Sequence, residues 1–374
     1  MAGDPTAAGP SPDELEISIF GPGYGECIAV HLGAGEWLIV DSCIDSRTSR
    51  PAVLTYFEFI GVDAASAVRR IVATHWHDDH VRGLAEIVRS CPRGEFYCSA
   101  ALQQNEFKVL VSLHGRDEDL LSGVSEFFEI QEELVARRTG SKPGVGQPHF
   151  ALANRIVWQR DATAASPSGL VRALSPSDGS LRLAFESIAG LIPAIESMKR
   201  RIPRPSPNHA SVVIWLEIGE NIKVLFGADL ESTAAEGTGW QAVIADDQCP
   251  SGGNVFKVPH HGSSNGHHAE TWSKMLSGDP IAVVCPYRNG SVLLPTDLDI
   301  ARIRRSSGEA YSTAKREPGH RRKRDSAVER TIRETVRRIK DSPGPIGQVR
   351  LRRRPSEMAW RVELIDGACE LAVA

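Results

Sequence analysis

Three histidines and two aspartates fall within six consecutive residues of this chain, directly after the apolar run Ile71-Val72-Ala73. The segment reads Thr74-His75-Trp76-His77-Asp78-Asp79-His80. In an extended segment, residues two apart project to the same side, so His75 and His77 can bind one ion. Asp79 and His80 follow where the chain turns into a helix, aimed at a second ion. Imidazoles and carboxylates at this density are typical of a metal site.

A plainer alternative is a solvated loop in which Asp78 or Asp79 caps the following helix. That helix is predicted by the spacing of Val81, Leu84, Ile87 and Val88. With 12 histidines in 374 residues, however, a chance HxHxDH pattern has odds on the order of one in a thousand. We therefore interpret the segment as a metal site on a strand, loop and helix unit.

The composition is that of a soluble globular protein, with 41% hydrophobic and 24% charged residues. This balance excludes a mostly disordered, a collagen-like or a disulfide-dense chain, and no apolar stretch reaches the ~20 residues that span a bilayer. The seven cysteines form no CxxC pair, which fits a reducing compartment and predicts a cytoplasmic protein. Residues 1–14 lack a secretion signal and are expected to be a disordered leader, followed by one domain over 15–374.

The pattern of strands and helices predicts a layered α/β sandwich. Alternation over Leu15–Phe20 indicates a strand with one buried face, and the hairpins through Asp41 suggest antiparallel strands at a sheet edge. Residues 101–200 read as a mostly helical insertion, with strands at 156–159 and 170–174. Further expected elements are the helix Ala52–Phe59, strands at 212–217, 223–226, 255–258 and 281–285, and a final hairpin over 348–354 and 359–364.

Charge is unevenly distributed along the chain. The whole sequence has 43 Lys and Arg against 47 Asp and Glu, whereas residues 302–361 hold 19 basic and 7 acidic residues. Clusters such as Arg321-Arg322-Lys323-Arg324 bind nucleic-acid backbones, so this C-terminal segment makes nucleic acid a candidate partner. Against this, a helix over 327–340 with an apolar stripe predicts simple docking on the core, and the arginines of the final hairpin have a structural alternative.

The HxHxDH segment resembles the signature of the metallo-β-lactamase superfamily. Three further segments are similar to family motifs: the turn 21–26 before Trp37–Asp41, the "GDLE"-like Gly227-Ala228-Asp229-Leu230-Glu231, and the "HHGS" segment His260-His261-Gly262-Ser263. The last is most similar to the soluble domain of ComEC-type competence proteins and to phosphorylcholine esterases. The resemblance covers residues 15–100 and 205–365. It implies a four-layer αββα sandwich.

The resemblance also implies roles for single residues. His75 and His77 would hold the first ion, Asp79 and His80 the second, and Asp229 would bridge the two. His209 would be the third ligand of the first ion, unless it is a loop residue and Asn208 is the retained feature. One of His260 and His261 would close the second site while the other supports the ligands or contacts substrate, and the sequence leaves that choice open. Asp41 resembles a position that supports the site.

These ligands predict a hydrolase with two divalent metal ions, zinc in the first place and manganese or iron as alternatives. A hydroxide between the ions would be the nucleophile, and Asp79, His260 and His261 would be the catalytic positions. The "HHGS" segment and the basic tail favour a phosphodiesterase or nuclease. The alternatives are a hydrolase of a small ester, lactone or thioester, and a non-catalytic binding protein with a structural metal.

Overall fold

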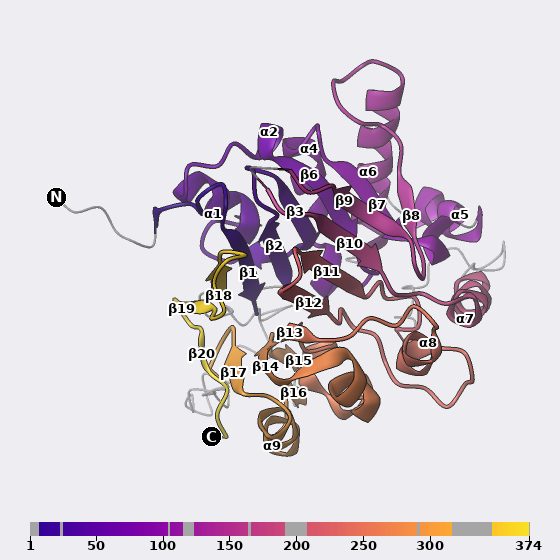
Figure 1. The fold of residues 1–374 in the computed structure, drawn as a ribbon. Helices are drawn as coiled ribbons and strands as arrows, with labels where there is room; N and C mark the ends of the chain where they lie inside the picture. Colours follow the sequence, from indigo (N-terminus) through magenta and orange to yellow (C-terminus); the bar gives the residue numbers. More distant parts are fainter. Residues whose placement is uncertain are drawn as a thin grey trace, which may run out of the picture.

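The computed structural model describes residues 7–22, 25–103, 105–114, 123–163, 166–190, 208–289, 292–315 and 346–373. Within these ranges, two eight-stranded sheets lie against each other and helices flank them (Figure 1). The outer ends of both sheets are formed by residues from near the C-terminus and from the middle of the chain. Segments far apart in the sequence therefore meet throughout the molecule.

The first sheet combines antiparallel and parallel pairing. Its order is β19 (Arg361–Ile365), β18 (Gly347–Arg353), β1 (Leu15–Gly21), β2 (Cys27–His31), β3 (Trp37–Asp41), β6 (Val68–Ala73), β7 (Glu95–Ser99) and β8 (His149–Ala151). Strands β3, β6, β7 and β8 are parallel. The N-terminal hairpins form as predicted, but they lie inside the sheet and not at its edge, because the C-terminal hairpin pairs with β1.

The second sheet has a parallel centre and antiparallel ends. Its order is β20 (Cys369–Glu370), β17 (Glu309–Ser312), β14 (Leu276–Val284), β13 (Gly253–Lys257), β12 (Ile222–Phe226), β11 (Ile214–Ile218), β10 (Gly169–Ala173) and β9 (Ile156–Arg160). Strands β12, β13, β14 and β17 run parallel. Their carboxyl ends therefore reach the same edge of the sheet, where loops commonly hold ligands.

Residues 101–200 are less helical than expected. Helices α5 (Asn105–His114), α6 (Gly123–Arg138) and α7 (Asp178–Ala189) form, and 191–200 lie outside the described residues. Between the helices, however, β8 joins the edge of the first sheet, and β9 and β10 form the edge of the second. The strands predicted at 156–159 and 170–174 are confirmed as β9 and β10, and only β8 was not predicted. The apolar side chains of these short strands complete the core between the sheets.

Three separate hydrophobic clusters define four layers. One lies between the first sheet and the helices α1 (Ala52–Phe59), α4 (Leu84–Ser90) and α6. The second lies between the two sheets. The third lies between the second sheet and helices that include α8 (Gly239–Ala245) and α9 (Asp297–Arg305). The predicted αββα sandwich is confirmed.

The alternation predicted that the polar face of β1 is exposed to solvent, but this face is buried. Glu16 and Ser18 are both 0% exposed. The Glu16 carboxylate accepts hydrogen bonds from Arg352 Nε at 2.7 Å and Tyr56 Oη at 2.6 Å. Buried carboxylates need such partners, and here β18, the neighbouring strand, supplies the arginine.

The arginines of β18 are therefore internal. Arg350, Arg352 and Arg353 are 0%, 5% and 2% exposed. This part of the basic C-terminal segment has the structural role that the sequence left as an alternative. The cluster Arg321–Arg324 and the helix expected at 327–340 lie outside the described residues.

Part of the expected leader contacts the folded domain. The carbonyl of Ala8 accepts a hydrogen bond from Arg352 Nη2 at 2.7 Å, and Glu14 pairs with Arg361 at 3.0 Å. Residues 1–6 are outside the described residues. All seven cysteines are free. Among the helices in the described ranges, none has the length and apolar character needed to cross a bilayer.

Candidate metal centre

Loops from both sheets converge at one place in the molecule. The loop after β6 carries His75 and His77 and runs into the short helix α3 (Asp78–Val81), which carries Asp79 and His80. The loop after β12 carries Asp229, and the loop after β13 carries His260 and His261. Asp41 ends β3, and because β3 and β6 are parallel neighbours, it lies beside the start of the His75 loop. Parallel pairing thus places the polar residues that follow several strands within reach of one another.

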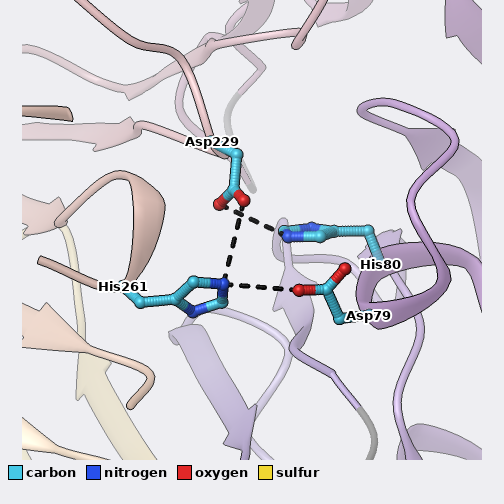
Figure 2. Close-up of side chains that lie close together, drawn as sticks. All are labelled: Asp79, His80, Asp229 and His261. Carbon is cyan, nitrogen blue, oxygen red and sulfur yellow. Dashed lines mark ion pairs between the residues drawn. The ribbon is translucent and has the colours of Figure 1, made fainter. Parts of the chain in front are cut away.

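Four side chains meet closely: Asp79, His80, Asp229 and His261 (Figure 2). Asp229 lies between the two imidazoles, with Oδ1 3.3 Å from His80 Nε2 and Oδ2 3.8 Å from His261 Nε2. His261 Nε2 is also 3.5 Å from Asp79 Oδ2. One potential ligand atom from each residue lies within 4.8 Å of the others. We call these four residues the metal group.

His75 approaches the same carboxylate from another side. Its Nε2 lies 4.0 Å from Asp229 Oδ2, and its ring centroid lies 4.2 Å from that of His80. His77 follows at a ring-centroid distance of 4.7 Å from His75. Asp229 therefore directs one oxygen toward His80 and the other toward His75 and His261, an arrangement suited to a carboxylate shared by two ions.

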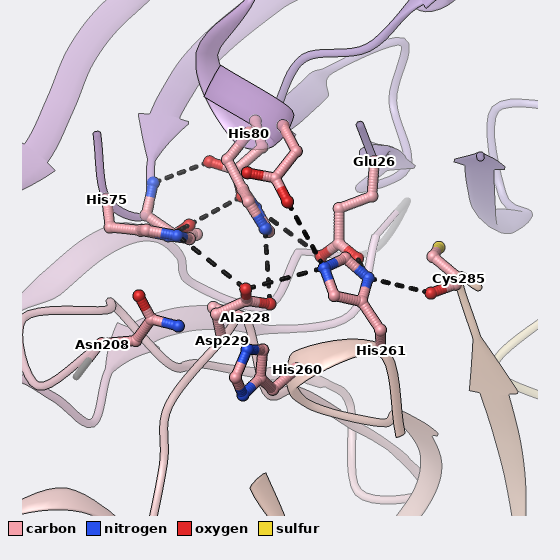
Figure 3. Close-up of polar contacts among 12 residues, drawn as sticks. Glu26, His75, His80, Asn208, Ala228, Asp229, His260, His261 and Cys285 are labelled. Atoms are coloured by element: carbon pink, nitrogen blue, oxygen red, sulfur yellow. Dashed lines mark hydrogen bonds and ion pairs between the residues drawn. The ribbon is translucent and has the colours of Figure 1, made fainter. Parts of the chain in front are cut away.

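Three of these imidazoles are held in the same way, through Nδ1. His80 Nδ1 is 2.7 Å from Asp41 Oδ2, and His261 Nδ1 is 3.0 Å from the carbonyl of Cys285. His75 Nδ1 is 3.0 Å from Thr74 Oγ1, whose own hydrogen is donated to Asp41. These partners accept the proton of Nδ1 and leave Nε2 facing Asp229 (Figure 3). Metal-binding histidines are commonly oriented by such bonds.

The electrostatics of the group favour cations at its centre. Burial alone raises the pKa of Asp229, but His80 and His261 outweigh it and hold the pKa well below the usual range. Burial likewise disfavours the His80 cation, yet Asp229, Glu26 and Asp41 raise its pKa well above the ordinary value. Burial, His80 and His77 lower the pKa of His75, which is therefore neutral and can donate its lone pair to a metal.

The residues present fit a metal ion. The buried atoms without a hydrogen-bond partner among the described residues include three that face one another: His75 Nε2, His80 Nε2 and Asp229 Oδ1. Such orphaned atoms are rare in folded proteins and require an explanation. A divalent cation would satisfy all three, and a donor set of imidazole nitrogens and carboxylate oxygens without sulfur suits zinc, manganese or iron.

The structure separates the two neighbouring histidines that the sequence could not distinguish. His261 belongs to the metal group, whereas His260 Nδ1 lies 3.3 Å from Glu231 Oε1 and its side chain is 20% exposed. Both residues have left-handed backbone, with φ of 46° and 54°. Strained backbone of this kind clusters at functional sites, and here it turns consecutive imidazoles in different directions.

His209 does not join the metal group in the part of the chain that the structure describes. It is 8% exposed, burial lowers its pKa, and it lies in a turn closed by the Ser211 N–H donating to the Asn208 carbonyl. The neighbouring Asn208 donates through Nδ2 to Glu231 Oε1 at 3.3 Å. His209 Nδ1 is itself buried without a hydrogen-bond partner among the described residues, so the choice between His209 and Asn208 stays a prediction.

Sequence reasoning missed two charged residues at the site, Glu26 and Lys257. Both are buried, and Lys257 Nζ donates to Glu26 Oε1. A usable signal existed, since Lys257 stands inside the apolar run Val255-Phe256-Lys257-Val258, where an unpaired charge would be costly. Asp41, expected as a support, does contact His80 and the loop at Thr74.

Comparison with known families agrees with this geometry. Residues 20–157 match the family model described as the metallo-β-lactamase superfamily. The matched stretch contains the HxHxDH loop and the strands that position it.

Solved structures, a metallo-β-lactamase among them, are also similar to this chain. A HARLDQ-motif mutant of the enzyme from Cronobacter sakazakii is 12% identical, with 60% of this chain and 65% of that chain covered and a TM-score of 0.33. Zinc-bound PqqB from Methylobacterium extorquens is 12% identical, with 68% and 75% covered and a TM-score of 0.35. This chain thus spans slightly less than two thirds of the length of the Cronobacter enzyme.

Proposed function

We propose that this chain is a metal-dependent hydrolase of phosphate esters that holds two divalent cations. The observation that carries the proposal is the convergence of three Nε2 atoms, from His75, His80 and His261, on the two oxygens of Asp229. In this assignment His75 and His77 serve one ion, Asp79, His80 and His261 serve the other, and Asp229 serves both. Bound cations of this kind lower the pKa of water and polarise the electrophile.

The protein's own residues divide the remaining work. Asp229 is almost completely buried, whereas the Asp79 side chain is 21% exposed, so substrate reaches the group from the side of Asp79. His260 and Glu231 are 20% and 12% exposed and form a polar pair next to the group. They can contact the substrate while the buried residues hold the ions.

Phosphate esters are favoured by the "HHGS" resemblance of residues 260–263. Among phosphate esters, the internal position of the β18 arginines favours a small diester over a nucleic acid, because those side chains are already paired inside the protein. A nuclease would need a basic surface elsewhere to bind nucleic acid. That the cluster at 321–324 provides this surface stays a proposal.

A substrate panel tests the proposal. Protein loaded with zinc or manganese is assayed on bis-p-nitrophenyl phosphate, DNA, a lactone and a thioester. We expect turnover of the diester that chelation abolishes, a loss of at least about a hundredfold in Asp79→Ala, and wild-type rates in the neighbouring Asp78→Asn control. Turnover only of the lactone or thioester would select the small-ester alternative. No turnover of any compound above a metal-free control would contradict a hydrolase.

A further inference from the structure

A buried ion pair joins the two sheets next to the metal group. Glu26 stands directly before β2 of the first sheet, and Lys257 is the last residue of β13 in the second. Their side chains are 3% and 0% exposed. Replacing a buried ion pair by apolar residues is often neutral or stabilising, because the charges lose their hydration. Its presence here therefore calls for a reason other than stability.

Glu26 contacts two of the three loops that form the metal group. Its backbone N–H donates to the carbonyl of Asp79 at 3.0 Å. Its Oε1 lies 3.8 Å from His80 Nδ1, and its Oε2 lies 3.8 Å from His261 Nδ1. A single carboxylate thus stands behind two imidazoles of the group, on the side opposite to Asp229 (Figure 3).

Lys257 contacts the third loop. Its Nζ donates to the carbonyl of Ala228 at 3.3 Å, and its own carbonyl accepts the N–H of Gly227 at 3.0 Å. The Ala228 carbonyl also accepts the N–H of His260 at 3.0 Å. Ala228 has a left-handed backbone, with φ of 45°, and is followed directly by Asp229. The lysine therefore holds the strained turn from which Asp229 projects.

The lysine is charged in this environment. Burial by itself lowers the pKa of Lys257, but the Glu26 carboxylate, together with Cys285 and Asp229, raises it above the ordinary value. The positive charge lies between the carboxylate of Glu26 and the carbonyl before Asp229. Lys257 and Glu26 are 231 positions apart in the sequence, and their ion pair connects the two sheets.

We propose that Glu26 and Lys257 are positioning residues that set the spacing of the three metal-binding loops. The inference rests on the proposed function, since it concerns the same site. Neither residue needs to touch an ion or the substrate. The pair fixes the distance between the Asp79–His80 loop and the two loops of the second sheet, so that Asp79, His80, Asp229 and His261 meet at ligand spacing.

The test removes both charges together, because removal of one partner leaves an uncompensated buried charge and endangers folding. In the full-length E26Q/K257M variant we expect a cooperative thermal transition, a dissociation constant for zinc raised about tenfold or more, and a changed visible spectrum of the cobalt-substituted protein. The variant E26D, which keeps both charges but shortens the carboxylate side chain by one methylene group, provides a second measurement with the same expected direction.

A matched control uses another buried ion pair. Glu16 and Arg352 lie 2.7 Å apart, are 0% and 5% exposed, and pair near the start of β1, away from the Gly21 turn. The variant E16Q/R352M should keep the wild-type zinc affinity and cobalt spectrum. Wild-type affinity and spectrum in E26Q/K257M, or equal losses in both double variants, would overturn the inference alone. A wild-type chain that binds no zinc or cobalt would overturn the proposed function as well.

Discussion

His80 and Asp41 are joined by a 2.7 Å contact between Nδ1 and Oδ2, although 39 residues separate them in the sequence. The same carboxylate accepts hydrogen bonds from Thr74 N and Thr74 Oγ1, both at 2.7 Å. Asp41 therefore fixes both the orientation of the His80 ring and the start of the HxHxDH loop. Burial raises the pKa of Asp41, against the opposing effect of His80.

Asp41→Asn should weaken metal binding although Asp41 is not itself a proposed metal ligand. The amide offers one acceptor oxygen in place of two, so it cannot serve both His80 and Thr74, and the zinc dissociation constant should rise ten- to a hundredfold. Calorimetric titration of the metal-free protein measures this. Asp45→Asn is the control, since Asp45 is also buried but bonds Arg47. Equal affinities in the two variants would contradict the supporting role of Asp41.

The adjacent histidines should differ in their contribution to metal binding. His261→Ala removes a member of the metal group and should lower the bound metal by about one ion per chain, whereas His260→Ala removes a side chain that contacts Glu231. Metal content after dialysis, measured by mass spectrometry, compares the two variants. The opposite pattern, with loss only in His260→Ala, would reverse the assignment.

Gly25 should tolerate no side chain. Its φ is +114°, and a Cβ would lie 1.9 Å from the carbonyl oxygen of Asp79. Gly25→Ala should therefore lower the free energy of unfolding by about 3 kcal/mol or more. Gly35→Ala is the matched control, because Gly35 also has positive φ, at +76°, but its Cβ would meet open space. That control should lose only about 1 kcal/mol in urea denaturation.

His31, which is not part of the metal group, should make the free energy of unfolding depend on pH. Its Nδ1 donates to the carbonyl of Glu14, and its Nε2 accepts the N–H of Gly35, so the folded protein holds the neutral ring. Burial lowers the pKa of His31 in the folded state. Because the unfolded residue titrates at about 6.5, the unfolded state binds more protons just below that pH.

The free energy of unfolding should accordingly fall as the pH drops below about 6.5, with a slope of at most about 1.4 kcal/mol per pH unit from this residue. Above pH 6.5 the contribution is constant. The difference between wild type and His31→Asn, measured by urea denaturation from pH 5 to 8, isolates it. A difference that does not change with pH would contradict the prediction.

Local patterns in the sequence predicted much of the fold. The helix Ala52–Phe59 and the strand Trp37–Asp41 have the predicted bounds, because side-chain periodicity follows directly from backbone geometry. The burial of both faces of β1 could not be predicted in this way. Glu16 and Ser18 appear polar and therefore solvated in the sequence, and only the pairing with β18 brings Arg352 to Glu16.

The sequence by itself determined that the HxHxDH loop follows a buried strand, because the apolar run Ile71-Val72-Ala73 directly precedes it. It also determined that these ligands lie near one another, because they fall within six consecutive residues. Tertiary structure alone decided that His261 joins the metal group and that His260 contacts Glu231. The direction of a side chain in a loop depends on backbone angles and on the packing of distant strands. For the same reason, Glu26 and Lys257 become partners only when the two sheets meet.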